Sequence, residues 1–78
     1  MSQLLIRGSI GPAVTTLQEN LNTVGCSCAV DGTYGANTEH AVKTFQTANG
    51  ISVDGKYGPG THAKMEECLA MLSGGDNA

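Results

Sequence analysis

A six-residue stretch that occurs twice constrains the fold of this chain more than any other feature. The two copies, Val30-Asp31-Gly32-Thr33-Tyr34-Gly35 and Val53-Asp54-Gly55-Lys56-Tyr57-Gly58, are identical at five of six positions. Each copy is followed, three residues after its last glycine, by a threonine, Thr38 or Thr61. A repeat of this kind indicates repeated local structure. The sequence therefore predicts two equivalent turns, each of which leads the chain into a helix.

The segment 12–24 is predicted to be the first helix. Pro12 suits the first helical position, where the N–H would have no partner anyway, and Gly25 suits the position just after the end. Apolar residues recur at helical spacing, at Val14, Leu17, Leu21 and Val24. The opposite, polar face is expected to carry Gln18, Glu19, Asn22 and Thr23.

Two further helices are predicted, one after each repeated turn. The second covers 36–48 and ends at Asn49-Gly50, because both residues tolerate a left-handed backbone. The third begins at Pro59. The apolar positions are Ala41, Val42 and Phe45 in the second helix, and Met65, Cys68, Leu69 and Leu72 in the third. The apolar run 4–6 is expected to form an extended arm, beside which Val30 and Val53 pair briefly.

Together these elements predict a mainly α domain over residues 4–72. We expect a compact three-helix bundle with the two repeated turns and at most minor short strands. With 78 residues the chain is one small domain, which buries only roughly 60–65% of the surface that its unfolded chain exposes. Residues 73–78 are polar and rich in glycine, so a flexible tail or a linker to another domain is expected there.

Charge narrows the range of partners. The net charge is −3 and there are only four Lys and Arg residues, so neither nucleic acid nor an anionic membrane surface is an expected partner. We expect a monomer with an uncharged or mixed-charge ligand. No run of 18 apolar residues could span a membrane. Residues 1–7 lack the apolar core of a secretion signal, so any export would use another route.

The three cysteines, Cys26, Cys28 and Cys68, leave two alternatives open. They are either small buried apolar groups, or one of the first two forms a disulfide with Cys68, which would close a loop of about 40 residues and contribute about 3–4 kcal/mol. A single Cys-x-Cys pair does not predict a zinc site. His40 and His62 fit no metal-binding or catalytic motif. No metal, cofactor or enzymatic activity is expected.

Three blocks of spaced residues follow one another in order along the chain. They are Arg7-Gly8-Ser9-x-Gly11-x-x-Val14-x-x-Leu17-Gln18-x-x-Leu21-Asn22-x-x-Gly25, then Val30-Asp31-Gly32-x-Tyr34-Gly35-x-x-Thr38-x-x-Ala41-Val42-Lys43-x-Phe45-Gln46-x-x-Asn49-Gly50, then Val53-Asp54-Gly55-x-x-Gly58-Pro59-x-Thr61. From about Leu4 to Leu72 the chain thereby resembles the peptidoglycan-binding domain, a three-helix module of bacterial and phage cell-wall hydrolases.

The resemblance implies a non-catalytic module that targets an attached hydrolase, such as an endolysin or amidase, to the cell wall. The expected ligand is the glycan or the stem peptide of peptidoglycan, and the expected location is extracellular or in the cell wall or periplasm. The same fold is similar to the pro-domain of matrix metalloproteinases, so a protein-interaction module is the alternative. A polar groove beside the repeated turns would favour the glycan, whereas a contiguous apolar patch would favour a protein partner.

Eight residues have the chemistry to bind such a ligand: Arg7, Asp31, Tyr34, Asn37, Asn49, Asp54, Tyr57 and Thr61. Arg7 could hold a stem-peptide carboxylate in bidentate fashion, and the two tyrosines could stack on sugars. All of them except Asn37 also have a structural alternative. The aspartates suit hydrogen bonds within their turns, the tyrosines suit half-buried positions, Thr61 and Asn49 suit helix ends, and Arg7 suits an ion pair.

Overall fold

The computed structural model describes residues 4–72 and contains three helices, α1 (Pro12–Thr23), α2 (Ala36–Ala48) and α3 (Pro59–Leu72). The predicted mainly α class is confirmed, and each helix begins at its predicted residue. α1 ends one residue earlier than predicted. Within residues 4–72 no helix is long and apolar enough to cross a membrane. The tail or linker expected at 73–78 lies outside the described residues.

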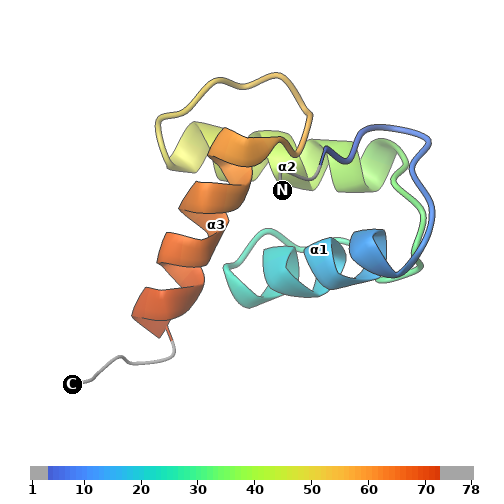
Figure 1. Ribbon diagram of the computed structural model, residues 1–78, viewed down its shortest axis with the longest axis horizontal. Coiled ribbons are helices and arrows are strands. Elements are labelled where there is room, and N and C mark those ends of the chain that lie inside the picture. The colour runs from blue at the N-terminus through green and yellow to red at the C-terminus, as the bar shows by residue number, and fades with distance from the viewer. Residues whose placement is uncertain (1–3, 73–78) are drawn as a thin grey trace.

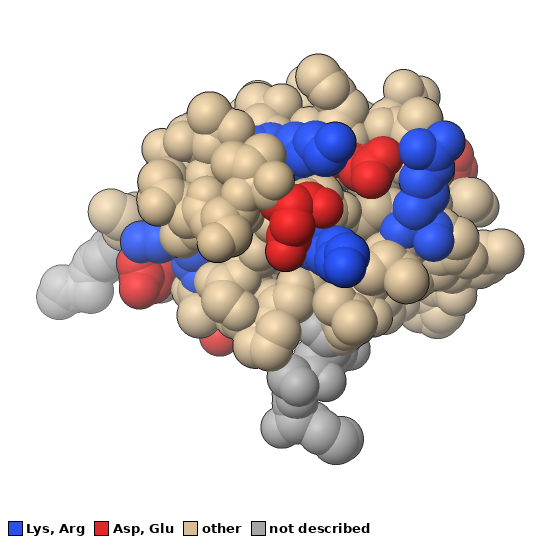
Figure 2. All heavy atoms as spheres, turned by 90° about the horizontal axis from the view of Figure 1, so that it is seen from above, with Lys and Arg blue, Asp and Glu red and all other residues tan. Residues whose placement is uncertain are grey.

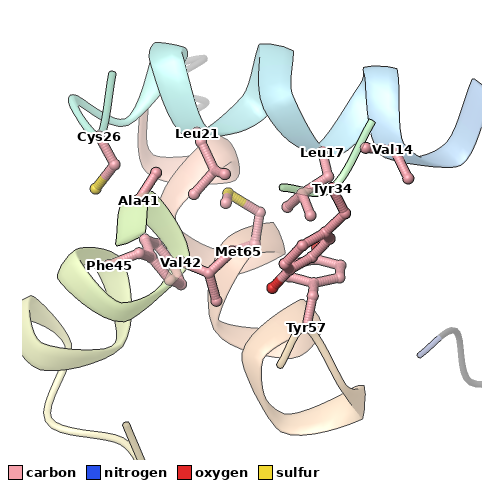
Figure 3. Packing of buried hydrophobic residues seen from close by; sticks show 10 residues of the cluster. All are labelled: Val14, Leu17, Leu21, Cys26, Tyr34, Ala41, Val42, Phe45, Tyr57 and Met65. Atoms are coloured by element: carbon pink, nitrogen blue, oxygen red, sulfur yellow. The ribbon is translucent and has the colours of Figure 1, made fainter. Parts of the chain in front are cut away.

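The helices pack around a single core. In Figure 1, α1 and α2 run in the same direction, one above the other, and α3 descends beside them. The buried apolar side chains from all three helices meet at the centre (Figure 3). The cluster consists of Val14, Leu17, Leu21, Cys26, Tyr34, Ala41, Val42, Phe45, Tyr57 and Met65. This one cluster anchors every helix of the described chain.

All three cysteines are free thiols in this structure. Cys26 is part of the core, and Cys28 and Cys68 pack against it. Burial raises the pKa of the Cys26 and Cys28 thiols above the ordinary value. The structure therefore shows the cysteines as small apolar groups, the first of the two alternatives.

The arm before α1 pairs with both repeated turns. Leu5 exchanges backbone hydrogen bonds with Tyr57, at 3.0 and 2.9 Å, in an isolated antiparallel bridge. A second bridge joins Ile10 to Thr33. The prediction that Val30 and Val53 pair beside the arm is wrong, since the bridges within residues 4–72 involve Thr33 and Tyr57 instead, and both valines are about half exposed, at 47% and 50%. The bridges fall later in each turn, at Thr33 and Tyr57, because the N–H groups of the preceding aspartate and glycine are bonded to a helix side chain.

The apolar stripe predicted for α3 is only partly buried. Met65 is fully buried and Cys68 and Leu69 are half-buried, but Leu72 is 60% exposed. The apolar positions predicted for this helix are therefore buried or half-buried only as far as Leu69. In Figure 1 the last turn of α3 extends away from α1 and α2, so no neighbouring helix covers it.

Candidate functional site

A buried glutamine from α1 holds the first repeated turn. The Gln18 carbonyl oxygen Oε1 accepts the backbone N–H groups of Asp31 and Gly32, at 3.0 and 2.9 Å. Its amide nitrogen Nε2 donates to Asp31 Oδ1, at 2.9 Å, and also contacts Thr33 O at 3.0 Å and Thr38 Oγ1 at 2.9 Å. The expectation that Gln18 lies on the exposed face of its helix is wrong, since it is fully buried.

Gln46 from α2 repeats this arrangement at the second turn. Its Oε1 accepts the N–H groups of Asp54 and Gly55, at 3.2 and 3.1 Å. Its Nε2 contacts Asp54 Oδ1 and Lys56 O, both at 2.9 Å, and Thr61 Oγ1 at 3.0 Å. We call each set a glutamine clamp. Each clamp joins a helix, the turn that follows it and the first turn of the next helix.

The aspartates close the clamps from within the turn. Asp31 Oδ1 accepts the backbone N–H of Thr33, and Asp54 Oδ1 accepts that of Lys56, both at 3.0 Å. These backbone hydrogen bonds, followed by the bond from the glutamine, hold the pKa of both carboxyl groups below the usual range. The structural role considered for the two aspartates is thus present in the structure.

Both tyrosines of the repeat are buried. Tyr34 is 1% exposed and donates its hydroxyl to the carbonyl of Gly55, so it links the first turn to the second. Tyr57 is 3% exposed and its hydroxyl lies 2.7 Å from His62 Nδ1. Burial, with Glu66 as a smaller contribution, raises the pKa of Tyr57 to about 12. Such burial leaves no ring face free, so the expected stacking of sugars on these tyrosines does not fit the structure.

A groove opens beside the second turn, and we call it the turn groove. It has a volume of about 360 Å³. Its lining residues come from the arm, from the segment after α2 and from the first turn of α3: Leu4, Ile51, Ser52, Asp54, Lys56, Gly58, Pro59, Gly60 and Thr61. The groove therefore combines a hydroxyl, a carboxylate and an ammonium group with apolar surface from Leu4, Ile51 and Pro59.

The other predicted residues lie outside this groove or are already bonded. Arg7 forms a 3.1 Å ion pair with Glu39. Asn49 caps α2, since its Nδ2 donates to Phe45 O at 2.9 Å. Asn37 is exposed on the first turn of α2. Only Asp54 and Thr61, of the eight predicted residues, line the turn groove.

Sequence reasoning missed the other two polar side chains of the groove, Ser52 and Lys56, and both clamp residues. A signal for the clamps was present. The spacing Val-x-x-Leu-Gln in α1 recurs as Val-x-x-Phe-Gln in α2. The repeat is hidden because Gln18 precedes Asp31 by 13 residues, whereas Gln46 precedes Asp54 by 8. Lys56 is the one position at which the two turn sequences differ.

Basic and acidic side chains alternate across the surface seen in Figure 2. The ion pair between Arg7 and Glu39 bridges the arm and α2. Lys64 and Glu67 form another pair, at 3.3 Å, on α3. A surface of this kind presents no extended field of one sign and suits a ligand of mixed or no charge.

Residues 10–65 match the family described as "Putative peptidoglycan binding domain". The chain is 38% identical over 74 residues to a "Probable N-acetylmuramoyl-L-alanine amidase" of Bacillus licheniformis. The aligned region covers 91% of this chain and 21% of the amidase. It spans only 19–26% of the length of the curated relatives that it matches.

Solved structures share the fold. The crystal structure of the SleB N-terminal domain matches with a TM-score of 0.79 and 35% identity, over 83% of this chain and 90% of that one. The crystal structure of Burkholderia AP3 phage endolysin matches with a TM-score of 0.74 and 33% identity, over 97% of this chain and 27% of the endolysin.

Proposed function

The chain belongs to the peptidoglycan-binding domain family, and we propose that it is a non-catalytic module that binds the cell wall through the turn groove. Its relatives include an amidase and a spore cortex-lytic enzyme, so we further propose that it holds an attached wall hydrolase at its substrate. A module of this kind raises the effective concentration of the tethered enzyme without itself catalysing a reaction.

The turn groove is the observation that supports this function. Peptidoglycan offers hydroxyl and acetamido groups on its sugars and amides and carboxylates on its peptides. Ser52 and Asp54 provide hydrogen-bonding oxygens, Lys56 provides a cation, and the remaining lining is mostly apolar. Shallow grooves with a few polar groups on an apolar lining are typical binding sites. The groove lies beside a repeated turn, the position expected for the ligand site, and its polar groups are set in a mostly apolar lining.

Asp54 has capacity left for a ligand. Its Oδ1 receives the bonds from Gln46 and from Lys56 N. Its Oδ2 has no hydrogen bond within residues 4–72, and neither has the Lys56 ammonium group. We infer that these two groups make the polar contacts with the wall. We also propose that the chain acts outside the membrane, as wall hydrolases do, and that it binds as a monomer.

The test is co-sedimentation of the purified chain with insoluble peptidoglycan sacculi, with chitin and cellulose as control polymers. We expect the chain to pellet with sacculi and to stay in solution with both controls. Lys56→Gln should weaken binding about tenfold, because a hydrogen bond to a charged group is worth about 1.5 kcal/mol or more. Lys64→Gln carries the same charge change on an exposed pair outside the groove and should bind as the parent does.

A second matched pair of variants distinguishes a role in ligand binding from the structural role of the aspartates in the clamps. Asp31→Asn and Asp54→Asn remove the same charge from equivalent turns, but only Asp54 lines the groove. We expect Asp54→Asn to weaken pelleting with sacculi and Asp31→Asn to leave it unchanged. A folded parent chain that stays in the supernatant would refute wall binding. Equal binding by Lys56→Gln and Lys64→Gln would refute the turn groove as the site.

One surface favours a second candidate function, contact with a protein. A mainly apolar hollow of about 590 Å³ is lined by residues at the end of α1 and on α3: Thr23, Val24, Gly25, Cys68, Met71 and Leu72. Met71 is 78% exposed there. A contiguous apolar surface is typical of protein contacts. If Met71→Ser and Leu72→Ser leave pelleting unchanged but abolish binding to a protein partner, this face serves the second function.

A further inference from the structure

We propose that a small cleft between α1 and α3 binds a methyl-bearing secondary amide as a second subsite for the wall. The cleft is lined by Ala13, Thr16, Leu17, Asn20, Tyr57 and His62. N-acetylated sugars and alanyl peptides both carry such a group. The inference rests on the proposed function, because peptidoglycan would supply the ligand.

One wall of the cleft is a face of α1 with unused hydrogen-bonding groups. Its four residues follow the i, i+3, i+4, i+7 spacing of a single helix face. Among the described residues, the Thr16 hydroxyl and the Asn20 side-chain amide have no hydrogen-bond partner. The two other threonines of α1 differ, since Thr15 and Thr23 each donate to the carbonyl four residues earlier. Thr16 and Asn20 are therefore free to bind a ligand.

The opposite wall is aromatic and fixed in position. The rings of Tyr57 and His62 meet edge to face, with centroids 5.6 Å apart and an interplanar angle of 83°. Tyr57 is bonded to His62 Nδ1, and His62 Nε2 lies 3.2 Å from Glu66 Oε2. Both ring nitrogens of His62 are thus engaged within the protein. Since Tyr57 is buried, the accessible ring of this wall is that of His62, whose side chain is 43% exposed, and the polar contacts are left to Thr16 and Asn20.

The size of the cleft limits the ligand to a small group. Its volume is about 140 Å³, well below the roughly 300–1,000 Å³ of pockets for drug-sized ligands. An acetamido group, with only four non-hydrogen atoms, is small enough for it. Its methyl group would lie on Ala13 and Leu17, its carbonyl oxygen would accept from Asn20, and its N–H would donate to Thr16. No lining residue carries an unpaired charge, which disfavours a carboxylate or phosphate.

The cleft and the turn groove flank the same turn of α3. Thr61 lines the groove and the next residue, His62, lines the cleft. Consecutive residues of a helix point about 100° apart, so the start of α3 forms a ridge between the two sites. One strand of wall polymer bound in the groove could therefore place an amide in the cleft.

The experiment is a ¹H–¹⁵N NMR titration of the whole chain with N-acetylglucosamine and with D-alanyl-D-alanine. Glucose and glycylglycine serve as controls, since glucose lacks the amide and glycylglycine lacks the methyl group. We expect saturable shifts of the Asn20 side-chain amide and of His62 with at least one of the two probes. Shifts with the sugar alone would identify the glycan as the source, and shifts with the dipeptide alone the stem peptide.

Three variants test whether the shifts come from the cleft. Asn20→Ala and Thr16→Val should each weaken probe binding roughly fivefold, because each removes one neutral hydrogen bond. Glu19→Ala, on the exposed neighbouring face of α1, should leave it unchanged. Absence of shifts with both probes, equal shifts with the controls, or unchanged binding by Asn20→Ala would overturn the proposal. Pelleting with sacculi but no cleft shifts would refute the cleft alone, whereas loss of pelleting would refute the proposed function.

Discussion

At the scale of single residues, two buried glutamines hold the repeated turns, and Gln46 holds the turn beside the groove. Each places a carbonyl oxygen against two backbone N–H groups, which can only donate, and an amide nitrogen against oxygen atoms. The surroundings therefore fix which way round each side-chain amide lies. A buried amide is stable only because these partners replace water.

We predict that Gln18→Glu and Gln46→Glu are both strongly destabilising. The substitution replaces the donating NH₂ group by a carboxylate oxygen, which would face the carboxylate of Asp31 or Asp54 at about the present 2.9 Å. We expect the free energy of unfolding to fall by about 3 kcal/mol or more, measured by urea denaturation. Glu19→Gln, at the exposed neighbouring position, should change it by less than about 0.5 kcal/mol. A small effect of Gln18→Glu would contradict the clamp.

The lowered pKa values of Asp31 and Asp54 predict how the stability of the fold changes at acid pH. Their pKa values are lowered in the folded chain by bonds from backbone N–H groups and from the glutamines. A lowered pKa contributes stability that is complete above the unfolded value, about 3.9 for aspartate, and is lost as the pH falls through the folded value. Urea denaturation between pH 6 and pH 2 should therefore show decreasing stability below about pH 4. The Asp31→Asn, Asp54→Asn double variant should show a flatter decline, and an identical decline would count against this account.

The sequence was a good guide to the aspartates and a poor guide to Gln18. An aspartate before glycine has a local role within its own turn, which a short stretch of sequence reveals. Gln18 instead bonds to residues 13 and 14 positions away. Helical periodicity places a polar side chain on the outer face by default, and nothing in α1 itself shows that its partners lie in a later turn.

At the scale of elements, the turns depend on glycine for two separate reasons. Gly55 has a φ angle of +75°, and a Cβ atom there would lie 3.0 Å from Lys43 Cε and 3.1 Å from Glu39 Cγ. Gly50, which follows α2, has a φ angle of +68° and no atom within 4 Å of such a Cβ. Replacing either glycine would strain the backbone, but only at Gly55 would the added Cβ atom also crowd neighbouring side chains.

This difference gives a graded prediction. Gly50→Ala should lose about 1–2 kcal/mol of unfolding free energy, the cost of a left-handed residue that has a Cβ atom. Gly55→Ala should lose about 1 kcal/mol more, because Lys43 and Glu39 must also move. Gly35→Ala, which has neither a positive φ angle nor a close contact, provides the baseline. Thermal and urea denaturation of the three variants would measure the order, and equal losses for Gly50→Ala and Gly55→Ala would argue against the crowding.

Helix boundaries were predictable because their signals are local. Pro12 and Pro59 mark two of the starts, and Asn49-Gly50 marks the end of α2. The end of α3 was not predictable in the same way. Leu69 and Leu72 look equivalent by periodicity, yet Leu69 is half-buried and Leu72 is exposed. Whether a helix face is covered depends on the length of its neighbours, which the helix's own sequence does not contain.

At the scale of the whole molecule, the arm joins parts of the chain that are far apart in sequence. Leu5 pairs with Tyr57, and Gly8 and Ser9 bond to the backbone of Tyr34 at 2.8 and 2.9 Å. Tyr34 in turn donates to Gly55. The two turns are therefore connected both through the arm and directly. These pairings escaped sequence reasoning because no local pattern in a run such as Leu4-Leu5-Ile6 specifies a partner some fifty residues later.

This connection predicts that damage to the arm weakens the distant turn and, with it, the turn groove. Leu5→Pro removes the N–H group that donates to Tyr57 O, whereas Leu5→Ala keeps that bond and removes only the half-buried side chain. We expect Leu5→Pro to cost about 1–3 kcal/mol more than Leu5→Ala, because the Tyr57 carbonyl loses its partner. Amide hydrogen exchange should then accelerate at Gly55 and Tyr57 more than in α1. If the arm were a passive extension, the two variants would be equally stable and exchange at the second turn would not change. The groove would then owe its shape to the Gln46 clamp alone, and binding to sacculi would survive the loss of the arm.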